Sequence, residues 1–323
     1  MAPTIDQLFA SPDHYLHSFE GDTAVFVAMD RAAYQRSIFL DRRISPAAEG
    51  AMRLPIATLL QAHYKPAATG WIFHVAHCGS TLLARALGEL GENLVLREPL
   101  ALRQLALEPD PARLELVLAM LSKRYPGAGP SIIKANVPVN FLLDAIAAAE
   151  PDARTIFLHL PLSDYLLAIL RSDNHRAWLR GVTGQLAPHL GDIASLNDPQ
   201  LAAALWLAMM RHFATAIEAM PGARSLNAEK FYNAPREALG AVADHFGMAV
   251  EAGAIDAVVS GPLFSTYSKN PTRAFDNDAR LTRKADMAEV LGDDIAEAQN
   301  WVERNAPDAD DLAKTIAGSA LKV

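Results

Sequence analysis

Short apolar segments alternate with helical segments from residue 71 to residue 246, and this alternation constrains the fold more than any other feature. The apolar segments are rich in β-branched and aromatic residues and are bounded by turns, which predicts buried strands. The predicted strands cover residues 71–75, 94–96, 131–135, 154–160 and 223–227. Apolar residues recur with helical spacing between them. Strands separated by helices form βαβ units, so we predict an α/β fold of three layers with a mostly parallel sheet.

The remainder of the chain is predicted to be mostly helical. Residues 1–65 are expected to form an N-terminal helical lead-in, and after a turn-rich boundary the main domain is expected to cover 66–323. Within it we expect a helical insertion at about 173–222 and a helical C-terminal region from residue 251. The polar stretch 264–283 is predicted to be a long loop, and loops over a rigid sheet often carry function.

The first predicted strand leads into the sequence HVAHCGSTLL, which has the features of an anion-binding loop. Ligands of parallel sheets bind beyond the carboxyl ends of the strands. Gly79 allows the backbone to approach a ligand closely, and Ser80 and Thr81 supply hydroxyl and N–H groups at the start of a helix. Because a helix N-terminus also carries a partial positive charge, we predict that residues 74–81 bind a phosphate-like group.

Other kinds of site fit this loop less well. The lysine that should follow Gly79 in the pattern G-x-x-x-x-G-K-[ST] is absent, as is the first glycine, so magnesium-dependent ATP hydrolysis is disfavoured. A cysteine phosphatase loop is also disfavoured, because six residues separate Cys78 from Arg85, whereas five separate the cysteine from the arginine in those enzymes. Cys78 is therefore expected to be a small loop residue, with a pKa lowered by backbone N–H groups. His74 and His77 lack an acidic third ligand, so no metal is expected, and His74 should lie in the core or bond to the backbone.

Four segments follow one another along the chain: WIFHVAHCGSTLLARAL, LVLREPL, SIIKANVPVNFLLDAIAAAEPDARTIFLHLP and ARSLNAEKFYNAPREALGAVADHFGM. The first resembles the 5′-phosphosulfate loop of the bacterial sulfotransferases, and the second resembles the strand end where an acidic residue of that family faces the acceptor. The third resembles the family's lysine after a strand, and the fourth its late strand and leucine-rich helix. The resemblance covers about residues 71–248.

The resemblance implies a P-loop sulfotransferase-like domain that transfers a sulfonate group from 3′-phosphoadenylyl sulfate to a hydroxyl or amine. The product would be 3′,5′-ADP, and the acceptor a small molecule or a peptide. The residues expected to bind the donor are Cys78, Gly79, Ser80, Thr81, Leu82, Arg171, Lys269 and Arg273. Where the family's 3′-phosphate site has an arginine and a serine, this chain has His159 and Leu167, or Ala168 with a shift of one residue. The candidate replacements are Arg171, Arg176 and Arg180.

Sulfonate transfer needs a base for the acceptor and positive charge near the departing phosphate. His77 is expected to donate a hydrogen bond to the leaving oxygen, with its pKa raised by the phosphate, or else only to shape the loop. Glu98 either takes the acceptor's proton or, before Pro99, places a charge at a helix N-terminus. Lys134 ends an apolar strand and is expected to reach the ligand or Glu98, because lysines are not buried alone. The candidate catalytic residues are therefore His77, Glu98 and Lys134.

Composition disfavours several other classes of protein. The formal net charge is −8, the opposite sign to that of a non-specific nucleic-acid binder. The single cysteine allows neither an intramolecular disulfide nor a thiol metal cluster. No basic segment followed by an apolar run begins the chain, and the apolar stretch 201–210 is about half the length of a membrane span. We therefore expect a cytoplasmic protein with no membrane partner.

Two other functions remain open from the residues alone. A divergent nucleotide-dependent phosphotransferase would bind ATP and require magnesium. A non-catalytic nucleotide-binding protein would bind the donor product tightly without turnover.

Overall fold

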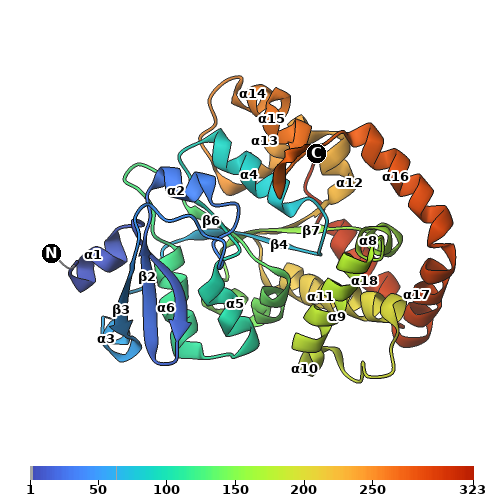
Figure 1. Ribbon diagram of the computed structural model, residues 1–323, viewed down its shortest axis with the longest axis horizontal. Coiled ribbons are helices and arrows are strands. Elements are labelled where there is room, and N and C mark those ends of the chain that lie inside the picture. The colour runs from blue at the N-terminus through green and yellow to red at the C-terminus, as the bar shows by residue number, and fades with distance from the viewer. Residues whose placement is uncertain (1–2, 63) are drawn as a thin grey trace.

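The computed structural model describes residues 3–62 and 64–323, and a parallel sheet of five strands lies at its centre (Figure 1). The strands are β4 (Thr69–His74), β5 (Val95–Arg97), β6 (Ser131–Lys134), β7 (Arg154–His159) and β8 (Ala223–Asn227). Their order in the sheet is β5-β6-β4-β7-β8, and every pairing is parallel. The predicted α/β fold with a mostly parallel sheet is confirmed, and all five strands lie within two residues of their predicted positions.

Helices cover both faces of the sheet (Figure 1). One face carries α4 (Ser80–Leu90), α13 (Pro235–Phe246), α14 (Ala254–Ser260) and α15 (Pro262–Ser265). The other carries α5 (Leu100–Leu107), α6 (Pro111–Leu121), the 3₁₀ helix η1 (Val137–Leu142), α7 (Leu143–Ala149) and α11 (Asp198–Ala219). The remaining helices of the main domain are α8 (Leu162–Ile169), α9 (Asp173–Gln185), α10 (Ala187–Leu190), α12 (Ala228–Asn233), α16 (Asn277–Val290), α17 (Gly292–Asn305) and α18 (Ala309–Gly318). The helical insertion and the helical C-terminal region are thus present.

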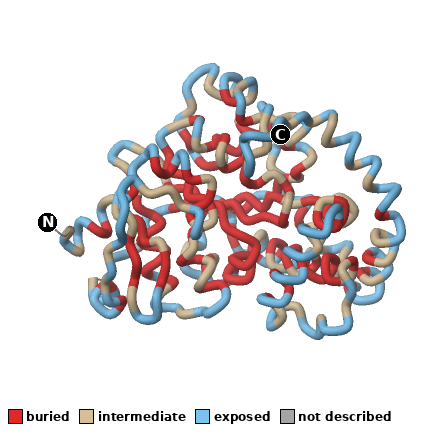
Figure 2. Tube along the Cα trace, viewed as in Figure 1, coloured by how far each residue is buried: buried red, intermediate tan, exposed pale blue. Residues whose placement is uncertain are grey.

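The sheet is the core of the molecule, as Figure 2 shows by its buried trace. Every residue of β4 is buried, because helices pack against both faces of the strand. Aromatic rings stack from β4 towards α11: Phe73 lies 5.8 Å from Phe157, and Phe157 lies 4.7 Å from Phe213, between ring centroids. This packing fixes the carboxyl end of β4, where the predicted anion-binding loop begins.

The N-terminal region differs from the expected helical lead-in. It contains an antiparallel sheet of β1 (His14–Glu20), β2 (Thr23–Ala28) and β3 (Ala51–Pro55), beside the short helices α1 (Ile5–Ala10), α2 (Arg31–Arg36) and α3 (Ile56–Leu60). The expectation was wrong because β1 and β2 are aromatic and β-branched strands joined by a tight turn in which Gly21 has a φ of +57°. The domain boundary near residue 65 stays a prediction.

The polar stretch that we expected to be a long loop is also ordered. It forms a hairpin of β9 (Thr266–Tyr267) and β10 (Asn270–Ala274), followed directly by α16. Asp276 accounts for the helix start, because its side chain accepts a hydrogen bond of 3.0 Å from the backbone N–H of Asp278. Arg85 of α4 donates to the carbonyl of Ser268 at 2.8 Å, which ties the hairpin to the helix after the anion-binding loop.

Arg97 at the end of β5 anchors the N-terminal region to the sheet. Its side chain is 4% exposed. The guanidinium donates to the carbonyl oxygens of Tyr34, Gln35, Ser37 and Ile38. Burial and the nearby Arg85 charge lower its pKa to about 10, so the side chain is still charged at neutral pH.

None of the helices in the described ranges combines the length and apolar character that crossing a membrane requires.

Replacing Arg97 by methionine should destabilise the protein strongly. Arg97→Met leaves several buried carbonyl oxygens without donors, and we expect the free energy of unfolding in urea to fall by about 3 kcal/mol. Arg53→Met is the control, because Arg53 forms an ion pair of 3.0 Å with Glu20 at the surface and should matter little. Equal losses in the two variants would show that Arg97 is no anchor.

Candidate functional site

The loop between β4 and α4 is held in a narrow turn. His77 and Gly79 both lie in the left-handed region, with φ values of +58° and +84°. A Cβ atom at position 79 would lie 2.6 Å from the hydroxyl oxygen of Tyr232, so the turn requires glycine for its conformation and for space. The first backbone N–H groups of α4 begin directly after this turn.

Two polar side-chain atoms of the loop are buried without a hydrogen-bond partner. Among the described residues, neither Oγ1 of Thr81 nor Nε2 of His77 has one. Buried polar atoms are normally hydrogen-bonded, so an unpartnered pair beside a helix N-terminus fits an anionic ligand with several acceptor oxygens.

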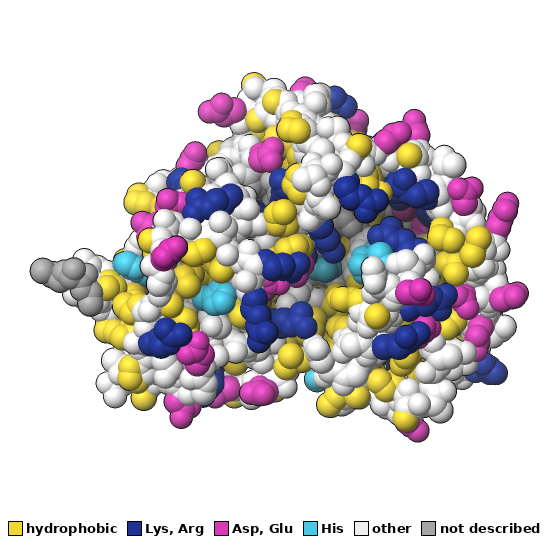
Figure 3. Space-filling model, in the orientation of Figure 1, with side chains coloured by type: hydrophobic (Ala, Val, Ile, Leu, Met, Phe, Trp, Pro, Cys, Tyr) yellow, Lys and Arg dark blue, Asp and Glu magenta, His cyan; other side chains and the backbone are white. Residues whose placement is uncertain are grey.

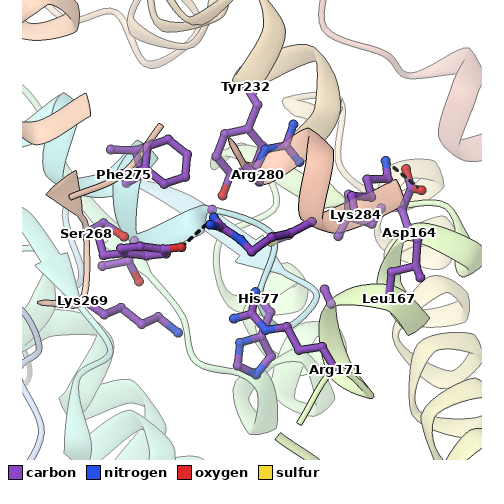
Figure 4. Close-up of a pocket in the computed structure, with 18 of the residues that line it drawn as sticks. His77, Asp164, Leu167, Arg171, Tyr232, Ser268, Lys269, Phe275, Arg280 and Lys284 are labelled. Carbon is purple, nitrogen blue, oxygen red and sulfur yellow. Dashed lines mark hydrogen bonds and ion pairs between the residues drawn. The ribbon is translucent and has the colours of Figure 1, made fainter. Parts of the chain in front are cut away.

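The loop opens into a cavity of about 610 Å³ (Figure 4). All the residues predicted to bind the donor line this cavity: Cys78, Gly79, Ser80, Thr81, Leu82, Arg171, Lys269 and Arg273. Figure 4 shows Lys269 and Arg171 on either side of His77. The structure therefore brings these residues together, and their role as ligands stays a prediction.

Positive charge is concentrated around the cavity although the chain as a whole is acidic. Of the described residues that line it, six are Lys or Arg and three are Asp or Glu. Arg280 pairs with Glu229 at 2.8 Å, and Lys284 pairs with Asp164 at 2.9 Å. In the described chain, Lys269 and Arg273 have no carboxylate partner, and neither does Arg171. Figure 3 shows Lys and Arg side chains gathered around a central hollow.

His77 is held in its neutral form. Its ring lies 4.4 Å from the ring of His175 and 5.4 Å from that of Trp178, between centroids. Burial lowers the pKa of His77 well below its usual value, and the charges of Lys269 and Arg171 add to the effect. The expected rise in the pKa of His77 therefore does not occur without a ligand, and only a bound anion can oppose these charges.

The expected low pKa of Cys78 was wrong. Its thiol is fully buried and donates to the carbonyl of Val75 at 2.8 Å. Burial raises the pKa to about 11, which outweighs the backbone N–H of Ser80. Cys78 is therefore a packed loop residue, in line with the prediction that it is no nucleophile. His74 bonds to the backbone as expected, with ring nitrogens 2.8 and 2.9 Å from the carbonyl oxygens of Val75 and Ala135.

Glu98 and Lys134 form a buried ion pair. Lys134 reaches Glu98, one of the two partners considered for it, and its side chain is 1% exposed. Burial raises the pKa of Glu98, but the charge and hydrogen bond of Lys134 together with the charges of His74 and Lys269 outweigh burial, and the net shift of the pKa is downward. Glu98 also has a φ of +56°. Neither residue is part of the cavity lining, so the structure groups them with each other rather than with His77.

The three arginines considered as replacements at the predicted 3′-phosphate site lie in different surroundings. Arg176 and Arg180 both pair with Asp198, which leaves Arg171 as the arginine of the three that faces the cavity. Leu167 lines the cavity and His159 does not.

Residues from distant elements complete the site and were not predicted. They include Asp164, His175, Glu229 and Tyr232. His175 and Trp178 have i, i+3 spacing in α9, which places both on one helix face, but this signal does not tell which face meets the cavity. Among the described residues, no group of three His, Cys, Asp or Glu side chains is placed to hold a metal ion.

No protein-family model matches the chain, and no curated protein does. Solved structures of similar fold include the sulfotransferase domain from the curacin biosynthetic pathway, with 10% identity over 71% of this chain and 98% of that chain, and a TM-score of 0.46. Another is the sulfotransferase domain of the Synechococcus PCC 7002 olefin synthase, with 14% identity, 71% and 96% coverage and a TM-score of 0.40. A third is a sulfotransferase from Alicyclobacillus acidocaldarius, with 12% identity, 73% and 96% coverage and a TM-score of 0.37.

Thr81 gives a cleaner test of the loop than Gly79, where any side chain disturbs the turn. Thr81→Val removes a buried hydroxyl that has no partner in the described chain, so the ligand-free protein should gain up to about 1 kcal/mol of stability. If the hydroxyl is a ligand donor, the affinity for inorganic pyrophosphate should fall about tenfold. Thermal unfolding and calorimetric titration measure the two effects.

Thr183→Val is the matched control for Thr81→Val. Thr183 is also buried, but its hydroxyl already donates to the carbonyl of Leu179 at 2.8 Å. This variant should lose stability and keep its affinity for pyrophosphate. A Thr81→Val variant that binds pyrophosphate as tightly as the wild type would contradict the anion site.

Proposed function

We propose that the protein transfers a sulfonate group from 3′-phosphoadenylyl sulfate to a hydroxyl or amine of an acceptor. The observation that carries the proposal is the loop with two unpartnered buried polar atoms, opening into a cavity with excess positive charge. The sequence resemblance of that loop to a 5′-phosphosulfate loop supports the choice of donor. In the reaction the acceptor atom bonds to sulfur, the bond from sulfur to the 5′-phosphate oxygen breaks, and the acceptor's proton passes to a base.

The cavity suits a nucleotide donor in size and lining. Its volume of about 610 Å³ lies in the range of small-molecule sites. Loop N–H groups and Thr81 would hold the 5′-phosphosulfate, and Lys269 and Arg273 would offset its charge. The apolar walls come from Leu160, Leu167, Ala168, Phe275 and Met287, and would contact the nucleoside.

Arg171 is the residue that we propose for the 3′-phosphate. It follows the end of α8, on which Leu167 takes the place of the family's serine, and both side chains line the cavity. A guanidinium can bind a phosphate with two parallel hydrogen bonds, which the shorter family serine cannot do.

His77 is proposed to stabilise the leaving group. As a neutral imidazole it can donate one N–H to the 5′-phosphate oxygen as negative charge develops there. Lys134 is proposed to keep Glu98 charged at the neighbouring strand end, where the pair would contribute to the acceptor side of the site.

A non-catalytic nucleotide-binding protein is the second candidate. One observation favours it: Glu98 is paired with Lys134 and its pKa is lowered, which weakens Glu98 as a base. A phosphotransferase is less favoured, because the loop has no lysine after Gly79.

The ligand preference tests the donor. We expect 3′,5′-ADP to bind more tightly than 5′-AMP or ATP in calorimetric titrations, and magnesium to leave its affinity unchanged. Arg171→Gln should reduce the preference for 3′,5′-ADP over 5′-AMP about tenfold, through loss of a charged hydrogen bond. ATP binding that strengthens about tenfold or more with magnesium would instead support a phosphotransferase.

Substitution of His77 tests whether the protein is an enzyme. A group that acts only on the leaving oxygen affects turnover more than affinity, so His77→Ala should lose about 10²-fold in turnover while donor affinity falls much less. His77→Asn is the companion variant, because asparagine tolerates the left-handed backbone and keeps an N–H donor. It should keep more activity than His77→Ala. Equal losses of affinity and turnover in His77→Ala would reduce His77 to a binding residue.

A further inference from the structure

A hydrogen-bonded chain fixes the ring of His175 inside the cavity. Nε and Nη2 of Arg171 lie 3.1 and 2.9 Å from Nε2 of His175, and Oγ of Ser172 lies 2.6 Å from Nδ1. Arginine has donors and no acceptor, so Nε2 of His175 must accept these bonds. The ring proton is therefore on Nδ1 and is donated to Ser172. His175 is a neutral imidazole whose one free lone pair is covered by Arg171.

His175 also lies beside the anion-binding loop. Its ring contacts that of His77, which lies in the anion-binding loop, with 4.4 Å between the centroids. Both residues line the cavity, as do Arg171 and Lys269. A reacting group beside the loop would therefore be close to both imidazoles.

The charges around His175 change when an anion enters the cavity. Burial, with smaller contributions from the charges of Arg171 and Lys269, lowers the pKa of His175 to about 4. Among the described residues, Arg171 and Lys269 form no ion pair with a carboxylate inside the cavity, and the carboxylate that acts on Lys269 from outside the lining is that of Glu98, which is paired with Lys134. A guanidinium binds a phosphate more strongly than it binds a neutral imidazole. Arg171 would therefore turn from His175 towards the anion. Nε2 of His175 would then be free, and the anion would raise its pKa towards the ordinary value of about 6.5.

Glu98 is less suited to accept the proton. It is paired with Lys134, its net pKa shift is downward, and it does not line the cavity. A neutral imidazole with a pKa that rises towards neutrality is the better base for an acceptor hydroxyl.

We propose that His175 is the base that takes the acceptor's proton, and that the bound donor prepares it by drawing Arg171 away from Nε2. This inference rests on the proposed sulfonate transfer. As the acceptor oxygen bonds to sulfur, its proton moves to Nε2 of His175. The bond from sulfur to the 5′-phosphate oxygen breaks, and the electron pair leaves with 3′,5′-ADP. The imidazolium then returns its proton to solvent. Without an anion in the cavity, Arg171 keeps the base covered.

The first test follows the histidine directly and needs no turnover. In ¹⁵N-histidine NMR of the full chain, the resonances of His175 are assigned as those absent from His175→Gln. Binding of 3′,5′-ADP should raise the pKa of His175 by about 1 or more, and inorganic pyrophosphate should act in the same direction. The same titration of Arg171→Gln should show a smaller rise, because the covering cation is gone. A pKa of His175 that 3′,5′-ADP leaves unchanged in the wild type overturns the proposal.

The second test is kinetic. His175→Gln keeps hydrogen-bonding groups but cannot take up a proton, so turnover should fall about 10²-fold or more, while the affinity for 3′,5′-ADP stays within about threefold. In the wild type, turnover should rise with pH as His175 loses its proton, and this limb should vanish in the variant. The groups facing His175 are Arg171, Lys269 and His77, and burial lowers the pKa of each of them, so the limb assigned to His175 is the one that His175→Gln abolishes.

His245→Gln is the matched control. Burial and the charges of Arg224 and Arg154 also lower the pKa of His245 to about 4, but this histidine is not part of the cavity lining. It should keep wild-type turnover. If His175→Gln turns over acceptor as fast as the wild type, the inference fails while sulfonate transfer stands. If the wild type binds 3′,5′-ADP but transfers sulfonate to no alcohol, phenol or amine, the proposed function fails, and so does the proposed role of His175 as the base.

Discussion

The hydroxyl of Tyr232 lies where a side chain at position 79 would have to go, and the whole site depends on this close approach. It favours glycine in the turn between β4 and α4, directly before the helix N-terminus whose first residues line the cavity. Left-handed backbone at a non-glycine residue persists only where the surroundings hold it. Here the buried Cys78 thiol, bonded to Val75, and the packing of β4 on both faces supply that support for His77.

The cavity cations add to the effect of burial on the imidazoles nearby. Burial, with smaller contributions from the charges of Lys269 and Arg171, lowers the pKa values of His77 and His175, so both imidazoles are neutral while the cavity holds no anion. A bound anion would offset the charges of Lys269 and Arg171 and raise both pKa values in the same step. Affinity for the donor and readiness for chemistry would then arise from the same charges.

The parallel sheet could be predicted because its strands are buried on both faces and read as continuous apolar runs. The N-terminal sheet was missed: the aromatic and β-branched residues of β1 and β2 are a strand signal, but β3 is short, ends at Pro55 and has no buried residue. The Glu98–Lys134 pair was anticipated from the cost of burying a lysine alone. His175 and Tyr232 were missed because they lie in helices about a hundred residues or more after the loop. The apolar periodicity of a helix predicts a buried face and an exposed face, but it does not predict which other elements each face contacts.

The segment that roofs the cavity is fastened at both ends. Ser268 at the hairpin tip accepts a hydrogen bond from Arg85, and beyond α18 the chain pairs with the edge of β8, where Ser225 bonds to Ser319 and Leu321. Between these points α16 has no buried residue. Ion pairs of Arg280 with Glu229 and of Lys284 with Asp164 hold α16 over the cavity, and α17 beyond it packs on α11 with Ala298 and Val302 buried. Because ion pairs rather than a buried apolar face hold α16, the position of this helix depends on the charges around the ligand.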